Sequence, residues 1–169
     1  VSPDGKKIAM ADYNGLGDTN GFGALVLYDF DNKTGKVSKS VEILTNSAAD
    51  GAPYGVEFSQ NSSKLYTTTL NGNKNNLFQF DLTASNISRT KKLIITQDGY
   101  RSGIQLAPDG KRYISIPNRT TLDIIENPNE NYENLIYKKQ GVQLDGKLTS
   151  QGLPPFIQSF FSPVNIVDS

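Results

Sequence analysis

Short runs of alternating hydrophobic and polar residues, separated by turns rich in Gly, Asn and Ser, make up most of this chain. The clearest runs are residues 53–58, 64–70 and 77–82, where Val, Tyr, Phe and Thr predominate. Because successive side chains of a strand point to opposite faces, this pattern predicts three short antiparallel strands. A fourth strand is expected at residues 91–95, after another polar turn.

The same succession of turn and strands occurs three times along the chain. Ser-Pro-Asp-Gly-Lys-Lys at residues 2–7 matches Ala-Pro-Asp-Gly-Lys-Arg at residues 107–112, and the degenerate copy Ser-Gln-Asn-Ser-Ser-Lys lies at residues 59–64. Self-similarity at this period is the signature of a repeat architecture. The alignment places Lys7 and Arg112 at equivalent positions.

Each turn is followed by three strands of the same kind: a hydrophobic strand, a strand that ends in an acidic or amide residue, and a closing strand. The expected second strands are residues 8–11, 65–69 and 113–116, the third strands 25–30, 77–82 and 122–127, and the fourth strands 37–44, 91–95 and 134–137.

Four antiparallel strands in a repeat of roughly 40 to 50 residues are typical of a β-propeller blade. We therefore predict an all-β fold, a partial β-propeller over residues 1–161 that contains about three four-stranded blades. The blades are expected at about residues 1–52, 53–100 and 101–151, with a closing segment at 152–161 and a linker to a following module at 162–169. The first copy lacks its inner strand, because the chain begins at the turn after it.

Three blades do not close a ring, since closed propellers have about four to eight blades. We expect this chain to be the C-terminal half of a larger propeller, whose remaining blades lie in the same chain or in a separate one. Gly55 and Gly103 fall at equivalent places on the expected inner strands. A residue without a side chain there is suited to the close approach of another backbone segment.

Composition narrows the classes of function. Basic and acidic residues balance at 17 each, which argues against nucleic-acid and membrane-surface binding, because both need a basic face. The chain has no Cys and no His, so thiolate chemistry is excluded and the commonest general base is missing. No run approaches the ~18 apolar residues of a membrane helix, so membrane insertion is not expected.

Five motifs follow one another at residues 2–9, 28–35, 53–59, 106–111 and 152–161, the last reading Gly-Leu-Pro-Pro-Phe-Ile-Gln-Ser-Phe-Phe. In this order they resemble the WD40-like β-propeller region of large secreted Bacteroidetes surface proteins. In that family the propeller precedes PKD or other Ig-like modules and a gliding-motility-type C-terminal sorting domain. The resemblance implies the C-terminal half of a seven- or eight-bladed propeller, export by the type IX secretion route, and a place at the cell surface or outside the cell. It implies no catalytic residues.

Three groups of residues are candidates for a functional site. Tyr13, Tyr54, Tyr100 and Arg101 fall in or beside expected loops, and Tyr and Arg are preferred anchors of binding surfaces. Tyr also packs routinely between blades, which is the alternative interpretation of these residues.

Glu57 and Gln105 lie at matching places on the expected inner strands. In lactonase-like propellers, acids and amides near the channel bind a metal ion or activate water. The same two side chains are equally suited to hydrogen bonds between blades, so both interpretations remain open.

The loop after the first strand gathers oxygen-bearing side chains around glycines, a composition that suits Ca²⁺. Its spacing departs from the EF-hand pattern, and a long solvated hairpin loop is the alternative. The candidate ligands are Asp12, Asn14, Asp18 and Asn20.

These observations favour a non-catalytic β-propeller module of a secreted or cell-surface protein, which acts in protein or glycan recognition or as a structural scaffold. Apart from the Ca²⁺ candidate, no cofactor is expected. The alternative is a lactonase- or hydrolase-type propeller enzyme whose catalytic residues lie in blades outside this chain.

Overall fold

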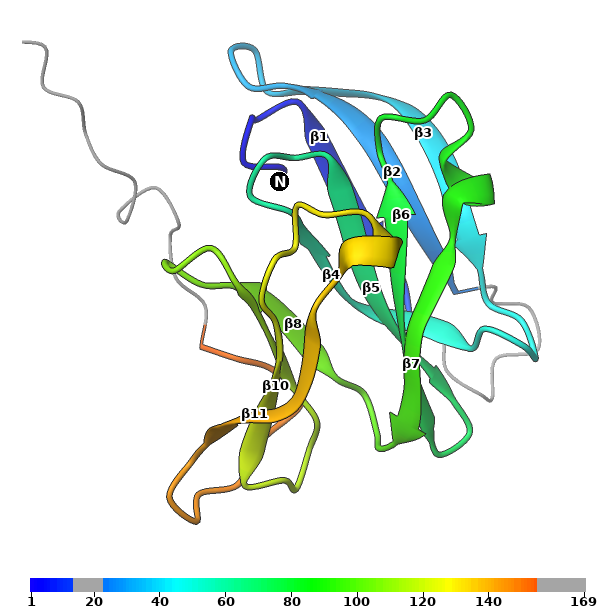
Figure 1. Cartoon of the computed structure of the whole chain (residues 1–169). Coiled ribbons are helices and arrows are strands. Elements are labelled where there is room, and N and C mark those ends of the chain that lie inside the picture. Colours follow the sequence, from blue (N-terminus) through cyan, green and yellow to red (C-terminus); the bar gives the residue numbers. More distant parts are fainter. Residues whose placement is uncertain (14–22, 155–169) are drawn as a thin grey trace, which may run out of the picture.

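A computed structural model describes residues 1–13 and 23–154, and strands dominate it (Figure 1). The strands form three antiparallel sheets in the orders β1-β2-β3, β4-β5-β6-β7 and β8-β9-β10-β11, so every strand pairs with its neighbours in sequence. The elements are β1 (Lys7–Ala11), β2 (Ala24–Asp31), β3 (Lys36–Thr45), β4 (Ala52–Phe58), β5 (Lys64–Asn71), β6 (Lys74–Asp81), the 3₁₀ helix η1 (Ile87–Thr90), β7 (Lys92–Asp98), β8 (Gly103–Leu106), β9 (Arg112–Ser115), β10 (Thr121–Ile125), the 3₁₀ helix η2 (Tyr132–Asn134) and β11 (Tyr137–Gln143).

The second and third sheets meet along their inner strands, β4 and β8, and the first sheet, which lacks an inner strand, meets the second through β1. β4 contacts β8 of the next sheet and β1 of the preceding one, and β3, β7 and β11 lie farther out (Figure 1). Consecutive meander sheets that adjoin in this way are blades of a β-propeller. The prediction of an all-β, partial propeller is thus confirmed, with four strands in the second and third sheets and three in the first.

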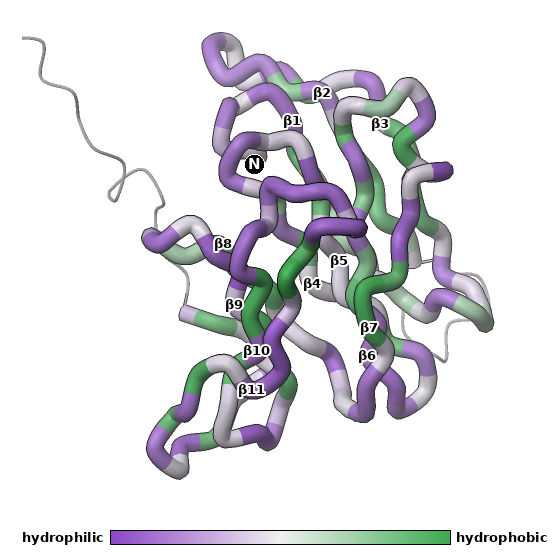
Figure 2. Tube along the Cα trace, viewed as in Figure 1, coloured by the Kyte–Doolittle hydropathy of each residue, from purple (hydrophilic) through white to green (hydrophobic). Residues whose placement is uncertain are grey.

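Two hydrophobic cores fill the spaces between the sheets. Leu65 pairs with Phe58 on one side and Phe80 on the other, so these three side chains share the face of the second sheet that packs on Leu25 and Leu27 of the first. The opposite face of the second sheet packs on the third sheet. This second core consists of Tyr66, Leu77, Ile104, Ile114, Ile116 and Ile125. By contrast, hydrophilic residues occupy most of the turns at the sheet ends (Figure 2).

All three copies of the repeated turn share one pattern of backbone hydrogen bonds, although the third copy is one residue shorter. The backbone N–H at the start of each turn donates to a lysine carbonyl at its end, from Ser2 to Lys7 and from Ser59 to Lys64 at 2.8 Å, and from Ala107 to Lys111 at 3.0 Å. The degenerate middle copy therefore folds like the others. It does so with Ser62 at φ 62°, where Gly5 and Gly110 take φ 70° and 80°.

This geometry corrects the sequence alignment of the third copy by one residue. The structural equivalent of Lys7 and Lys64 is Lys111, because the third turn is one residue shorter, and Arg112 instead takes the place of Leu65 opposite the preceding strand. Each of the three lysines forms an ion pair with an acidic residue at or near the end of the neighbouring strand, which is β2, β6 or β10. The pairs are Lys7–Asp29 at 3.1 Å, Lys64–Asp81 at 3.1 Å and Lys111–Glu126 at 2.8 Å.

The expected fourth strand of the third copy, residues 134–137, was misplaced. The structure has η2 at Tyr132–Asn134 and the strand β11 at Tyr137–Gln143. β11 is an outer strand that is largely exposed, so it lacks the hydrophobic alternation by which the other strands are recognised. Of the expected closing segment, residues 152–154 are described and form no regular element.

The described part of the chain holds no helix with the length and apolarity to cross a bilayer.

Candidate functional site

Side chains of the inner strands bind the backbone of the segment that follows in the ring. Glu57 on β4 accepts hydrogen bonds from the N–H of Phe58 and of Leu106, both at 3.0 Å. Gln105 on β8 donates to the carbonyl of Pro154 at 2.9 Å. Glu57 and Leu106 are 49 residues apart in the sequence, and so are Gln105 and Pro154. Residues 151–154 therefore occupy the same position relative to β8 as β8 occupies relative to β4.

The two inner-strand glycines lie where these segments approach most closely. A Cβ added to Gly55 would lie 2.6 Å from the carbonyl oxygen of Ser102, and one added to Gly103 would lie 2.9 Å from the carbonyl oxygen of Gln151. No side chain fits at such distances, so the close approach requires glycine at both positions.

Tyr13, Tyr54, Tyr100 and Arg101, chosen from the sequence as binding candidates, come together in one cluster, which we call the Tyr–Arg cluster. Tyr13 follows β1, Tyr54 lies on β4, and Tyr100 and Arg101 lie in the connection between β7 and β8. The cluster therefore joins the first sheet, the second sheet and the connection that leads to the third. It lies at the end of the inner strands where the chain passes from one blade to the next.

The Arg101 guanidinium is the centre of the Tyr–Arg cluster. Its Cζ lies 4.0 Å from the ring centroid of Tyr13, 5.0 Å from that of Tyr100 and 5.9 Å from that of Tyr54. The rings of Tyr13 and Tyr54 meet edge to face, with centroids 6.0 Å apart and an interplanar angle of 84°. These are the geometries of cation–π and T-shaped aromatic contacts. The ring faces therefore stabilise the cation, and the contact between Tyr13 and Tyr54 keeps two of the rings in place.

Electrostatics keep Arg101 charged. Its interaction with the Tyr13 hydroxyl, the largest of several influences, raises the pKa of Arg101 above its ordinary value. Within residues 1–13 and 23–154, Nε of Arg101 is buried without a hydrogen-bond partner, and no carboxylate forms an ion pair with the guanidinium. The cluster thus presents a permanent positive charge that aromatic faces surround.

Gln151 belongs to the same region and was not found from the sequence. The Tyr54 hydroxyl donates to Oε1 of Gln151 at 3.2 Å, across the junction of the second sheet with residues 151–154. An isolated Gln in a polar stretch gives no signal of such a role. Only the equivalence of residues 151–154 to the start of β8 would have indicated it.

The remaining sequence candidates have different surroundings. Both carboxylate oxygens of Glu57 accept backbone N–H groups, and Gln105 binds a carbonyl, so the polar ends of both side chains are engaged in contacts with the backbone. Of the Ca²⁺ candidates only Asp12 lies within the described residues; Asn14, Asp18 and Asn20 lie outside them. The described residues contain no group of three or more acidic side chains placed to hold a metal ion.

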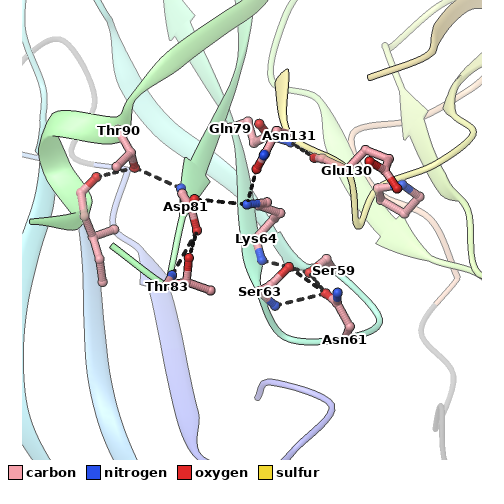
Figure 3. A network of polar contacts seen from close by, with 12 residues as sticks. Ser59, Asn61, Ser63, Lys64, Gln79, Asp81, Thr83, Thr90, Glu130 and Asn131 are labelled. Carbon is pink, nitrogen blue, oxygen red and sulfur yellow. Dashed lines mark hydrogen bonds and ion pairs between the residues drawn. The ribbon is translucent and has the colours of Figure 1, made fainter. Parts of the chain in front are cut away.

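A second polar region joins the second sheet to the segment that precedes η2 (Figure 3). Nζ of Lys64 lies between Oδ2 of Asp81 at 3.1 Å and Oδ1 of Asn131 at 2.6 Å. Burial raises the pKa of Asp81, but hydrogen bonds from Thr83 and Lys64 outweigh that effect and leave the pKa below its ordinary value. Beside Asp81 and Asn131 is a pocket of about 270 Å³, which Gln79 also lines. Both polar partners of the Lys64 ammonium, Asp81 and Asn131, are protein groups. The network is therefore interpreted as a structural link between the second sheet and the segment before η2.

The architecture is that of a segment of a β-propeller, and comparison with known proteins adds the following. No family model and no curated protein matches the chain. Among solved structures it is similar to TolB from Acinetobacter baumannii, with 22% identity over 82% of this chain and a TM-score of 0.47. It is also similar to the propeller domain of the Trilobed protease from Pyrococcus furiosus, with 23% identity over 74% and a TM-score of 0.43. A third similar structure is a putative 6-phosphogluconolactonase from Bacteroides fragilis, with 15% identity over 82% and a TM-score of 0.48. The chain spans 30%, 38% and 39% of the lengths of these structures.

Proposed function

We propose that this β-propeller segment is a non-catalytic recognition module of a secreted or cell-surface protein, and that it binds a protein or glycan ligand through the Tyr–Arg cluster. The observation that carries the proposal is the convergence of three tyrosines around the Arg101 guanidinium, from the end of β1, from β4 and from the connection between β7 and β8. Tyr and Arg dominate the energetics of many binding surfaces because each combines a large contact area with hydrogen-bonding groups.

The position of the cluster suits recognition. Tyr100 is 45% exposed, so one ring remains available to a ligand while the other rings and the guanidinium are half-buried. The strands, together with the hydrogen bonds of Glu57 to β8 and of Gln105 to Pro154, hold the supporting backbone in place. Side chains on such a support lose little conformational entropy on binding.

A non-catalytic role is supported by the state of Glu57, whose two oxygens are both engaged by backbone N–H groups. A general base or metal ligand needs an oxygen that faces the reacting group. The sequence adds no His or Cys that could take over the role.

The experiment compares ligand capture by the wild-type chain and by a Tyr100→Ala, Arg101→Gln double variant on a glycan array and in pull-downs from the host's extracellular medium. We expect the double variant to lose the captured ligand. Tyr132→Ala is a matched control for the aromatic change, because Tyr132 is 40% exposed but lies in η2, away from the cluster. If the double variant retains every ligand that the wild type binds, the proposal is wrong.

The extracellular location is tested separately. Antibodies against the chain should label intact host cells, or the protein should appear in the culture medium. Labelling that requires lysis of the cells would contradict this part of the proposal and leave the binding site untouched.

A further inference from the structure

Arg101 differs from the other half-buried or buried arginines of the described chain. Arg112 is fully buried, and burial lowers its pKa to about 10, yet its guanidinium donates to the carbonyls of Phe58 and Gly110, at 2.8 Å from Nε in the first case and 3.0 Å in the second. Arg119 donates to Oε1 of Gln97 at 3.3 Å and to the carbonyl of Asp98 at 2.7 Å. Both guanidiniums are bound by protein oxygens.

Among residues 1–13 and 23–154, the Arg101 guanidinium contacts three tyrosine rings and the Tyr13 hydroxyl and forms no ion pair, and its Nε–H is buried without a hydrogen-bond partner. A buried donor without a partner destabilises a fold and is rare in native proteins. Ring faces stabilise the charge of a guanidinium but leave its N–H edge without the oxygen acceptors that its planar fork matches best. The cluster therefore positions a cation whose preferred partner, a carboxylate, is missing from the described residues.

We propose that the ligand of the Tyr–Arg cluster is an acidic sugar, whose carboxylate binds the Arg101 guanidinium while its ring packs on Tyr100. This inference rests on the proposed function and deepens it, because it names the class of ligand. Arginine binds carboxylates through two parallel N–H···O bonds, and these charge-assisted bonds are among the strongest that proteins make.

The surroundings of Arg101 favour a sugar over a peptide. The side chains of the cluster are phenolic, and Gln151 adds an amide next to the Tyr54 hydroxyl. Aromatic faces next to hydroxyl and amide groups match a ligand with C–H faces and many hydroxyls.

The test uses trigalacturonate and its methyl ester, which share the sugar rings and differ in charge. Titration calorimetry on the wild-type chain should give an affinity for the acid at least about 10-fold above that for the ester, the range of a hydrogen-bonded charge. Arg101→Gln should bring the two affinities together, while Arg101→Lys, which keeps the charge without the fork, should retain part of the difference. Arg89→Gln removes an exposed arginine in η1 and should change neither affinity.

Each other outcome overturns a defined part of the reasoning. If trigalacturonate and its methyl ester bind equally and Arg101→Gln weakens both, the cluster is still a binding site, but the proposal that it recognises a carboxylate is wrong. A tripeptide with a free C-terminal carboxylate that binds where trigalacturonate does not would overturn the sugar. No binding by any probe, together with an unchanged array profile of the double variant, would reject the site itself.

An internal counter-ion is the rival explanation, and Asp18 is the acid in sequence nearest to Tyr13 beyond Asp12. Thermal unfolding of Asp18→Asn, Arg101→Gln and the double variant forms a double-mutant cycle. The proposal requires additive effects. A strong coupling between the two substitutions would show that Asp18 neutralises Arg101, and the inference would fail.

Discussion

Replacement of Gly55 by alanine should destabilise the junction between the second and third sheets. The added Cβ would lie 2.6 Å from the carbonyl oxygen of Ser102, 2.8 Å from Oγ1 of Thr68 and 3.2 Å from Cγ2 of Ile104. Two of these neighbours are hydrogen-bonded to each other, because the Thr68 hydroxyl donates to the Ser102 carbonyl at 2.5 Å. Oγ1 of Thr68 also accepts a hydrogen bond from the Gly55 N–H at 2.9 Å. The Cβ cannot be accommodated unless the start of β8 moves away and this bridge opens.

The size of the effect follows from these two costs. Overpacking of a tight site destabilises by about 1–3 kcal/mol, and the loss of a buried hydrogen bond adds about 1 kcal/mol. We therefore expect Gly55→Ala to lower the free energy of unfolding by about 2–4 kcal/mol. For a chain of this length that corresponds to a fall in Tm of roughly 5–15 °C.

Thermal unfolding followed by circular dichroism measures the fall, and hydrogen exchange should locate it at β4 and β8. Gly152→Ala is the control, because a Cβ at Gly152 has no atom within 4 Å, and its stability should stay within about 0.5 kcal/mol of the wild type. If Gly55→Ala unfolds at the wild-type temperature, the inner strands do not pack as closely as described and the argument from glycine is wrong.

Three further predictions concern the turns and the buried polar groups. Ser62→Gly should stabilise the chain by about 0.5–1 kcal/mol in urea unfolding, because Ser62 has φ 62°, where glycine is less strained; Ser62→Ala should bring no gain. Lys64→Met should destabilise by about 2–3 kcal/mol, because the lysine side chain of the pair with Asp81 is only 6% exposed, whereas Lys7→Met, in the equivalent pair at 32% exposure, should cost at most about 1 kcal/mol; equal effects would contradict the role of burial. Burial raises the pKa of Tyr66 to about 12, so its neutral form contributes stability that is present below about pH 10 and is lost as the pH rises towards 12; Tyr66→Phe should flatten that alkaline decline, and an unchanged slope would refute it.

The architecture was predictable because it is written in local patterns. Runs of Leu, Tyr, Thr and Phe bounded by polar turns marked strands such as β5 and β6, which are buried along nearly their whole length. The turn at Ser59 was recognisable even without Pro-Asp-Gly, since Asn61 supplies the same side-chain acceptor to Ser63 N–H that Asp109 supplies to Lys111 N–H, both at 3.1 Å. Turn chemistry of this kind is carried by a few residue types.

The errors arose where position in space, and not local pattern, decides the structure. Arg112 looked like one more lysine-type residue of a turn, but a turn one residue shorter moves it onto the buried face, where carbonyl oxygens bind it. β11 escaped recognition because an exposed outer strand can be polar along its length. Neither feature can be derived from hydrophobic periodicity.

The candidate site was predictable in its members and not in its assembly. All four residues, Tyr13, Tyr54, Tyr100 and Arg101, were selected by residue type and by an expected position in or beside a loop. Their convergence depends on how β1, β4 and the β7–β8 connection meet, which is set by the packing of three sheets. Gln151 had no distinguishing feature in the sequence, because its role comes from the segment that it begins.

The contacts of Glu57 and Gln105 have a consequence for how such arrays grow and diversify. Each side chain binds a backbone N–H or carbonyl of the next segment, and backbone groups are the same in every residue type except for the missing proline N–H. A duplicated blade inserted at either junction would meet acceptable partners at once, without compensating substitutions. Successive copies could then diverge in their core residues and in their ligands, while the backbone contacts that join them stay the same. Leu65 and Arg112, which occupy equivalent positions in two of the sheets, show such a difference between cores.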